Sequence, residues 1–590
     1  MKFLGTTLFE KDLSVNDFAD VLVPLAQASR HPTVVAEYAR RRSAEGRRSP
    51  RLGSGLDPGG EKKISDGDAD AATAVDREDG MLRTTSDEYS PYTIEGLKAE
   101  VREDLSAGGH DTAYDLKSKV INKAIQDIGM GRYNYQLFIL CGFGWYADNL
   151  WLQGIALTLP SLQAEFGVAE TTVRYTTMSL FIGLCIGASF WGIGSDIMGR
   201  RIAFNMTLLL AGVFGIASGA APTWIGACGL FAALGVGVGG NLPVDGALFL
   251  EFLPNASGGL LTLLSVWWPV GQLVASLIGW AFLGGKYAED KGWRYFVYTM
   301  GTMTFVMFLA RFLLFHLYES PKFLLSRGRQ AEAVAVVHGM AKKNRTTTWL
   351  TEEILNEIGG DPAVAADATL TTKQIIMRKL SSFSTERIGP LFANRKLGMT
   401  TALVWFSWLA IGMGYPLFNA FLPQYLARGT DSSGVTIGVN ETYRNYAITS
   451  VVGVPGSIIA CWTVDIKYIG RKGTMAISTM LSGIFLFLFT LKSDSDYQLI
   501  FSSLEAFFQN IMYGVLYAYT PEVFPAPNRG TGTGIASMLN RIAGLCAPII
   551  AANIPDADPS APVFVSGGLF LAAFVAMILL PIETRGKQML

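Results

Sequence analysis

The chain has 590 residues, of which 50% are hydrophobic and only 16% are charged. Because a soluble domain carries about 25% charged residues, this deficit indicates that most of the chain is surrounded by lipid. The formal net charge of −1 provides no positive field for nucleic acid, so we expect no nucleic-acid partner. The five cysteines lie singly and lack metal-binding spacing, so we expect no metal site and no cofactor.

The N-terminal segment, residues 1–114, is polar and irregular, with a basic run at 39–51 and an acidic stretch at 65–79. Such a segment cannot bury enough apolar surface to offset its chain entropy, which predicts a disordered cytosolic tail. Residues 115–130 carry apolar side chains on one side of a short helix. We expect this amphipathic helix to lie on the cytosolic surface of the membrane.

Twelve apolar segments follow, each close to the roughly 20 residues that a membrane-spanning helix needs. They form two groups of six, which predicts an all-α membrane protein with twelve transmembrane helices in two pseudo-symmetric bundles. The first bundle and its amphipathic helix occupy residues 115–318, a cytosolic central loop with short helices 319–398, and the second bundle with a short tail 399–590. The predicted spans are 136–160, 172–194, 202–220, 224–249, 258–284, 294–316, 399–425, 442–464, 473–491, 497–520, 530–553 and 561–582.

Orientation follows from Lys and Arg, which are enriched in cytosolic loops. The central loop holds twelve of them between residues 319 and 396. We therefore expect both termini in the cytosol of a multi-pass protein of the plasma membrane. In this topology Asn440 starts the one Asn-x-Ser/Thr sequon that lies outside, so only Asn440 is predicted to be glycosylated; the other sequons start at Asn205, Asn255 and Asn344.

Two charged motifs recur six spans apart. GIGSDIMGRR at 192–201 follows the second span and DIKYIGRK at 465–472 follows the eighth, while EFLP at 251–254 and PEVFP at 521–525 follow the fourth and tenth. Such repetition is typical of duplicated transporter halves. We expect Asp196 to cap the next helix and Arg200 to reach a carboxylate on an adjacent helix; simple anchoring by positive charge is the alternative. The predicted cytosolic gate comprises Asp196, Arg200, Arg201, Glu251, Asp465, Arg471, Glu522 and Arg529.

Together with ESPKFL at 319–324, PEVFPAPNRGTG at 521–532 and ETRGK at 583–587, these motifs resemble the major facilitator superfamily. The resemblance covers residues 115–590. Within the superfamily, the motifs look like those of the sugar-porter and synaptic-vesicle-protein-like metabolite transporter branches. It implies two bundles that rock around a midplane site. Phe231 stands where these branches usually carry Arg, and the sugar-porter QLS signature is absent from 405–412. These departures argue against a hexose substrate and against a standard Asp–Arg proton switch.

Ionisable residues within spans are costly and usually functional. Asp148 lies near the middle of the first span and Asp245 toward the cytosolic end of the fourth. Both are candidates for proton coupling, because desolvation favours a neutral, proton-carrying acid; a structural hydrogen-bonding role is the alternative for each. Arg541 in the eleventh span could pair with an acid of span one, bind an anionic substrate, or form a structural ion pair with Glu505.

Aromatic and amide side chains gather at the central depth of the spans, a combination that suits a small organic ligand. Each of them could instead serve packing or the membrane interface. The predicted substrate-binding residues are Trp145, Asn149, Gln153, Trp268, Gln272, Tyr415, Asn419, Gln509 and Tyr513, together with Arg541.

The sequence therefore predicts a secondary active transporter of a small polar organic metabolite, working as a monomer in the lipid bilayer by proton-coupled symport. An uncoupled facilitator, an exporter and a non-transporting nutrient receptor are the alternatives. An enzyme is disfavoured, because the chain shows no nucleotide loop, metal cluster or nucleophile triad.

Overall fold

The structure is a computed structural model, and most of the chain is described. The described residues are 15–28, 93–106, 113–254, 260, 263–285, 291–315, 317–360, 388–430, 434–463, 466, 469–524, 529–553 and 560–584.

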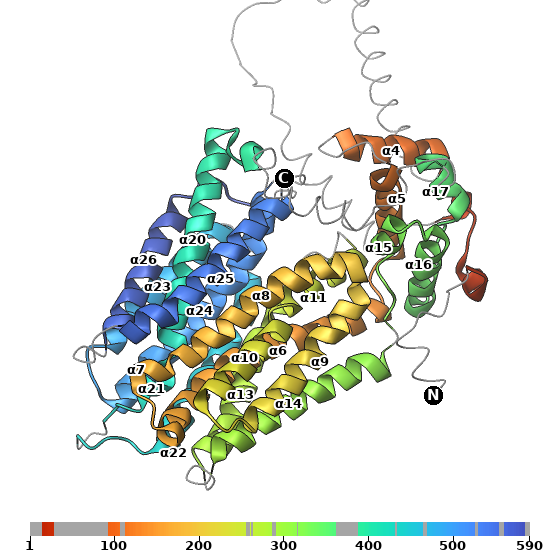
Figure 1. The fold of residues 1–590 in the computed structure, drawn as a ribbon. Coiled ribbons are helices and arrows are strands. Elements are labelled where there is room, and N and C mark those ends of the chain that lie inside the picture. The colour runs from red at the N-terminus through yellow and green to blue at the C-terminus, as the bar shows by residue number, and fades with distance from the viewer. Residues whose placement is uncertain are drawn as a thin grey trace, which may run out of the picture.

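Two six-helix bundles form the body of the molecule (Figure 1). The spans of the first bundle are α6 (Arg132–Phe166), α8 (Tyr175–Met198, after the short α7, Glu170–Val173), α9 (Arg200–Gly219), α10 (Trp224–Val238) continued by α11 (Asn241–Phe252), α13 (Trp267–Leu283, after η4, Leu264–Val266), and α14 (Gly292–Leu309) continued by η5 (Ala310–Leu314). Those of the second are α20 (Arg395–Asn419, after η7, Gly389–Phe392), α22 (Val439–Thr463, after the short α21, Leu422–Leu426), α23 (Gly470–Phe489), α24 (Ser495–Val523), α25 (Arg529–Asn553) and α26 (Ala561–Ile578).

Ten helices among the described residues are long and apolar enough to cross a membrane. Helices α6 and α22 complete the two bundles. The bundles meet along α13 and α22 and along α8 and α25. All twelve predicted spans therefore correspond to helices, with ends shifted by a few residues.

Three short helices of the central loop gather at one end of the first bundle (Figure 1). They are α15 (Pro321–Ser326), α16 (Gln330–Asn344) and α17 (Glu352–Gly359). We call this end of the molecule the loop-helix end. The amphipathic helix α5 (Ala113–Ile128) packs against all three. Its apolar residues, such as Val120 and Ile125, are buried in this cluster rather than facing lipid, which differs from the predicted position on the membrane surface.

Parts of the N-terminal tail also belong to this cluster, in contrast to the disorder predicted for residues 1–114. The short helix η1 (Val15–Val21) packs on α16, and η2 (Leu25–Gln27) follows it. The Val23 amide donates to the Thr348 carbonyl at 3.0 Å, and the Thr348 amide donates to the Val21 carbonyl at 2.9 Å. Helix α4 (Ile94–Ser106) contacts α5 and α17. These two pieces of the tail are attached to the loop-helix cluster.

Candidate functional site

A cavity of about 120 Å³ lies between the two bundles. Six of the ten predicted substrate-binding residues line it, and so does one of the two predicted coupling acids. Sequence reasoning missed several further polar lining residues. One helical turn separates Tyr517 from the predicted Tyr513 and Ser537 from the predicted Arg541, so helical periodicity could have found them. The predicted residues in the lining are Asp148, Asn149, Trp268, Gln272, Tyr415, Tyr513 and Arg541; those missed include Asn510, Tyr517, Ser537 and Asn540.

Asp148 is the carboxylate of this cavity. It sits midway along α6 and is 5% exposed. Its Oδ1 accepts a hydrogen bond from Asn241 Nδ2 at 3.2 Å, and the same amide lies 3.3 Å from the Gly144 carbonyl. Asn241 opens α11, so the break between α10 and α11 delivers this donor to the acid. Arg541 on α25 interacts electrostatically with Asp148 across the bundle interface.

A chain of amides and hydroxyls crosses the cavity. Gln272 Nε2 donates to Asn149 Oδ1 at 2.9 Å and to the Tyr415 hydroxyl at 3.0 Å. Because Tyr415 belongs to α20, this side chain of α13 bridges the two bundles. Solute that breaks this bridge would gain three polar partners at once, which suits a polar organic ligand.

Aromatic rings form the floor of the cavity toward the loop-helix end. Trp145 and Trp268 stack with centroids 4.7 Å apart, and Tyr517 of α24 lies 4.5 Å from Trp268. Tyr415 and Tyr513 meet edge to face at 5.6 Å. The contact of Trp268 with Tyr517 joins the first bundle to the second through ring surfaces, which a flat ligand could share.

The other four predicted binding residues are engaged outside the cavity lining. Trp145 lies behind Trp268 in the stack. Gln153 donates to Ser276 at 3.2 Å, and Asn419 lies 3.5 Å from the Tyr415 carbonyl. Gln509 donates to Glu505 at 2.5 Å. Glu505 is thus bound to a neighbour on its own helix, rather than to Arg541 as one prediction allowed.

The second coupling candidate, Asp245, lies in a separate buried ion pair. Its Oδ2 is 2.6 Å from Arg311 Nη2, and both side chains are fully buried. Arg311 also donates to the Leu140 and Phe204 carbonyls at 2.9 and 2.8 Å. Sequence reasoning missed Arg311, although an arginine inside the apolar run of the sixth span was the available signal.

Arg311 and Asp245 join α6, α9, α11 and η5 inside the first bundle. Arg311 lies over the Phe204 ring, 3.7 Å from its centroid. A Cβ on Gly144 would fall 1.8 Å from Asp245 Oδ2, so the close approach of α6 to the pair requires glycine here. This arrangement fits a structural clamp better than a proton carrier.

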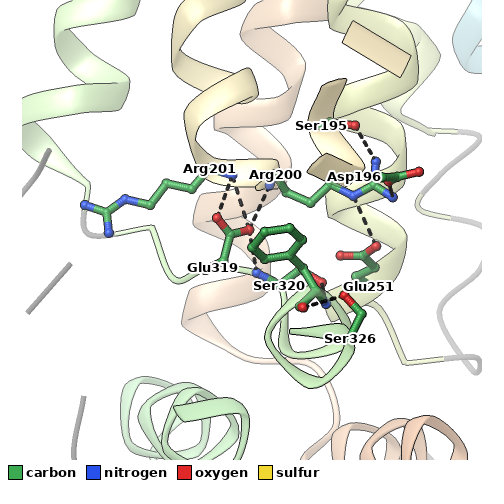
Figure 2. Close-up of polar contacts among 9 residues, drawn as sticks. Ser195, Asp196, Arg200, Arg201, Glu251, Glu319, Ser320 and Ser326 are labelled. Atoms are coloured by element: carbon green, nitrogen blue, oxygen red, sulfur yellow. Dashed lines mark hydrogen bonds and ion pairs between the residues drawn. The ribbon is translucent and has the colours of Figure 1, made fainter. Parts of the chain in front are cut away.

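Charged groups cluster where α8 meets α9 at the loop-helix end (Figure 2). Arg200 contacts Asp196 at 2.6 Å and Glu251 of α11 at 3.4 Å. The start of α9 is capped by Glu319, whose Oε1 accepts from the Arg200 amide at 2.8 Å. Asp196, which was predicted to cap the next helix, forms an ion pair with Arg200 here, while Glu319 accepts from the amide at the helix start. The Arg201 side chain points away from Glu251 (Figure 2).

Glu319 occupies an unusual setting for an acid. It is 7% exposed and also accepts from the amides of Arg201 and Ser320. Burial raises the pKa of Glu319 from 4.5 to about 7, although these amides favour the ionised form. Gly199 precedes the capped helix with φ of 103°, a conformation that side chains rarely adopt. Glycine at this turn thus lets the carboxylate reach the helix start.

The second bundle repeats this arrangement. Arg471 pairs with Glu522, and Glu583 accepts from the Arg471 amide at 3.2 Å and the Lys472 amide at 3.1 Å. Gly470, the first residue of α23, also has a positive φ, of 63°, like Gly199 before α9. Two further predicted gate groups, Asp465 and the side chain of Arg529, lie outside the described residues.

A series of contacts joins the bundles at the end opposite the loop helices. Arg174 donates to Gln424 at 3.1 Å and to the Ala551 carbonyl at 2.7 Å. Tyr443 donates to the Leu157 carbonyl at 3.0 Å. Asn440 is exposed here, and its Nδ2 donates to the Gly284 carbonyl at 2.6 Å. These contacts hold the two bundles together at this end, beside a pocket of about 520 Å³. The ion pairs of Arg200 and Arg471, by contrast, each stay within one bundle.

Comparison with known proteins identifies relatives along nearly the whole chain. The family model "Sugar (and other) transporter" matches residues 136–383, and "Major Facilitator Superfamily" matches residues 404–588. The chain is 42% identical over 530 residues to "MFS siderochrome iron transporter 1" of Ceriporiopsis subvermispora, covering 88% of this chain and 100% of that protein. It is 26% identical over 483 residues to "Synaptic vesicle 2-related protein" of Xenopus laevis, covering 79% and 82%.

Among solved structures, the chain resembles the inward-open, partially occluded xylose transporter XylE from E. coli. The TM-score is 0.58 at 18% identity, with 77% of this chain and 99% of that chain covered. This likeness concerns the fold. Together the comparisons confirm the predicted twelve-helix fold with two bundles, the resemblance to transporters, and the expectation that the chain is not an enzyme.

Proposed function

The chain belongs to the major facilitator superfamily, and on this premise we propose that it is a secondary active transporter that carries a small polar organic solute together with a proton. The observation that carries the proposal is the position of Asp148. This acid lines the cavity between the bundles, where it can take up a proton in contact with a bound solute. Asp148 accepts a hydrogen bond from Asn241 of its own bundle and interacts electrostatically with Arg541 of the other bundle, so a movement between the bundles would change its surroundings.

The proposed cycle uses alternating access around the cavity. In this cycle the contacts of Arg174 and Tyr443 would hold the opposite end closed. The charge groups of Arg200 and Arg471 would lock or release the loop-helix end.

Because the central loop is rich in Lys and Arg, we place this end and both termini in the cytosol, with the protein in the plasma membrane. The cavity is complete within one chain, which supports a monomer.

The test is uptake by purified protein in liposomes under an imposed pH gradient. Wild-type protein should accumulate its solute, and a protonophore should abolish the accumulation. Asp148→Asn, which mimics the protonated acid, should lose accumulation while it retains binding and equilibrative exchange. Glu441→Gln removes a surface carboxylate outside the cavity and serves as the matched control.

Each alternative gives a different result in this assay. An uncoupled facilitator would equilibrate solute without accumulating it, and an exporter would accumulate it only in the reverse orientation. A nutrient receptor would bind solute without moving it. Undiminished accumulation by Asp148→Asn would remove Asp148 from the coupling mechanism.

A further inference from the structure

Arg541 is a cavity-lining cation from the second bundle. Its guanidinium reaches across the interface to the carbonyls of Leu184 and Gly239, at 3.3 and 3.5 Å. Both distances are long for hydrogen bonds, and both partners are neutral. Among the described residues, Arg541 forms no contact ion pair with a carboxylate. Most of its five N–H donors are thus available to a ligand in the cavity.

The charges near Arg541 reduce to a simple balance. Asp148 of α6 and Arg541 of α25 line the same cavity and attract one another, while Asp245 of α11 and Arg311 of η5 neutralise one another. The remaining titratable neighbours of Arg541 in the described structure are Tyr517 of α24 and the Cys185 thiol of α8. The Glu505 carboxyl lies near the lining residues Tyr415 and Tyr513 and accepts from Gln509. With Asp148 ionised, the cavity is neutral overall. With Asp148 protonated, it carries the uncompensated positive charge of Arg541.

The size and walls of the cavity restrict what this charge can bind. Its volume is about 120 Å³, which limits the ligand to a small molecule. Tyr415, Tyr513 and Trp268 supply ring surfaces. Two lining groups, Trp268 Nε1 and Asn540 Oδ1, are buried without a hydrogen-bond partner in the described structure. A single planar ring with polar edge atoms fits these walls, whereas a large metal chelate does not.

We infer that Arg541 binds the carboxylate of a small monoanionic substrate with one planar ring, and that Asp148 competes with this carboxylate for the guanidinium. This inference rests on the proposed function. When Asp148 takes up a proton, its negative charge disappears and the substrate carboxylate replaces it beside Arg541. When the substrate leaves, Asp148 releases its proton and faces Arg541 again.

This exchange has a consequence for the charge that crosses the membrane. The empty cavity contains ionised Asp148 and Arg541, with a sum of zero. The loaded cavity contains neutral Asp148, Arg541 and one carboxylate, again with a sum of zero. One proton moves with each substrate anion, so transport is electroneutral. An imposed membrane potential should therefore leave the rate unchanged.

The experiment measures binding of benzoate and the pyridinecarboxylates to the purified full-length protein, each against its neutral amide. At least one acid should bind about tenfold or more tightly than its amide, because a charge-assisted hydrogen bond replaces a neutral one. Affinity for this acid should rise from neutral to mildly acidic pH. Asp148→Asn should hold the high affinity at both pH values, and Arg541→Gln should remove the preference for acid over amide.

The amide comparison in wild-type protein keeps the test informative if Arg541→Gln does not fold. Equal binding of every acid and its amide, or no binding of either, overturns the inference. If a neutral or cationic solute is instead accumulated with protons, the result supports the proposed function and refutes the inferred carboxylate site at Arg541. If an acid binds through Arg541 but is not accumulated, the site stands and the proposed function falls. Transport of the acid that responds to membrane potential contradicts the charge balance.

Discussion

The buried pair of Asp245 and Arg311 should contribute far more to stability than to transport. Arg311→Met preserves most of the side-chain volume and leaves Asp245 as an uncompensated buried charge. Loss of one partner of a buried ion pair costs about 3–5 kcal/mol. The carbonyls of Leu140 and Phe204 would also lose donors at 2.9 and 2.8 Å, adding roughly 1–3 kcal/mol each if they stay unsatisfied. We expect a loss of at least about 3 kcal/mol.

Thermal unfolding of purified protein in detergent, followed by tryptophan fluorescence, measures this loss. Arg311→Met with Asp245→Asn should recover part of the stability, because the double variant has no buried charge at this site. Gly144→Ala should resemble Arg311→Met, since its Cβ would lie 1.8 Å from Asp245 Oδ2. A single Arg311→Met variant as stable as wild-type protein would refute the reasoning and return Asp245 to the candidates for proton coupling.

The remaining predictions concern the loop-helix end. Because the pKa of Glu319 rises to about 7 on folding, the folded state binds this proton more tightly than the unfolded chain. The free energy of unfolding should therefore fall by about 3 kcal/mol as the pH rises from about 4.5 to 7. Glu319→Gln should flatten this part of the plot of melting temperature against pH, and an unchanged slope contradicts the assignment. Deleting residues 1–28 should speed hydrogen exchange at Thr348, because the deletion removes two backbone hydrogen bonds of this residue, each worth about 0.5–1.5 kcal/mol. Exchange in α16 should also rise, because η1 packs on this helix, while insertion and transport persist. Equal exchange in the truncated and full-length proteins would show that the tail contact is dispensable. Replacing Arg200 or Glu251 by Ala should lower the turnover number about tenfold and leave the affinity for the solute nearly unchanged. A tenfold change corresponds to about 1.4 kcal/mol on the barrier of the conformational change. Unchanged turnover with a large loss of affinity would instead place these residues in the binding step.

The spans and the paired charges of the gate could be predicted because they depend on local pattern. A run of about 20 apolar residues has few stable arrangements other than a spanning helix. The repeated GRR and GRK turns placed Arg200 and Arg471 near acids one helix away, and the structure brings them to Glu251 and Glu522.

Pairing over long sequence distances could not be predicted from a single sequence. Nothing local connects Asp245 with Arg311, which are 66 residues apart and meet only after four helices pack. The capping role of Glu319 was assigned to Asp196, because both are acids close to the start of the same helix. Likewise, the tail segment around Val21 is too short to form a core alone, and it is ordered by the surface of α16.

The two carboxylates that cap α9 and α23 have a consequence for how the chain can be divided. Glu319 follows the last span of the first bundle and Glu583 follows the last span of the second. In each bundle, a carboxylate that follows the sixth span thus binds the start of the third span of the same bundle. A gene divided between α17 and α20 would encode two polypeptides, and each would retain the carboxylate that caps the third span of its bundle. When the two polypeptides are coexpressed, they should assemble through α8, α13, α22 and α25 into a functional transporter.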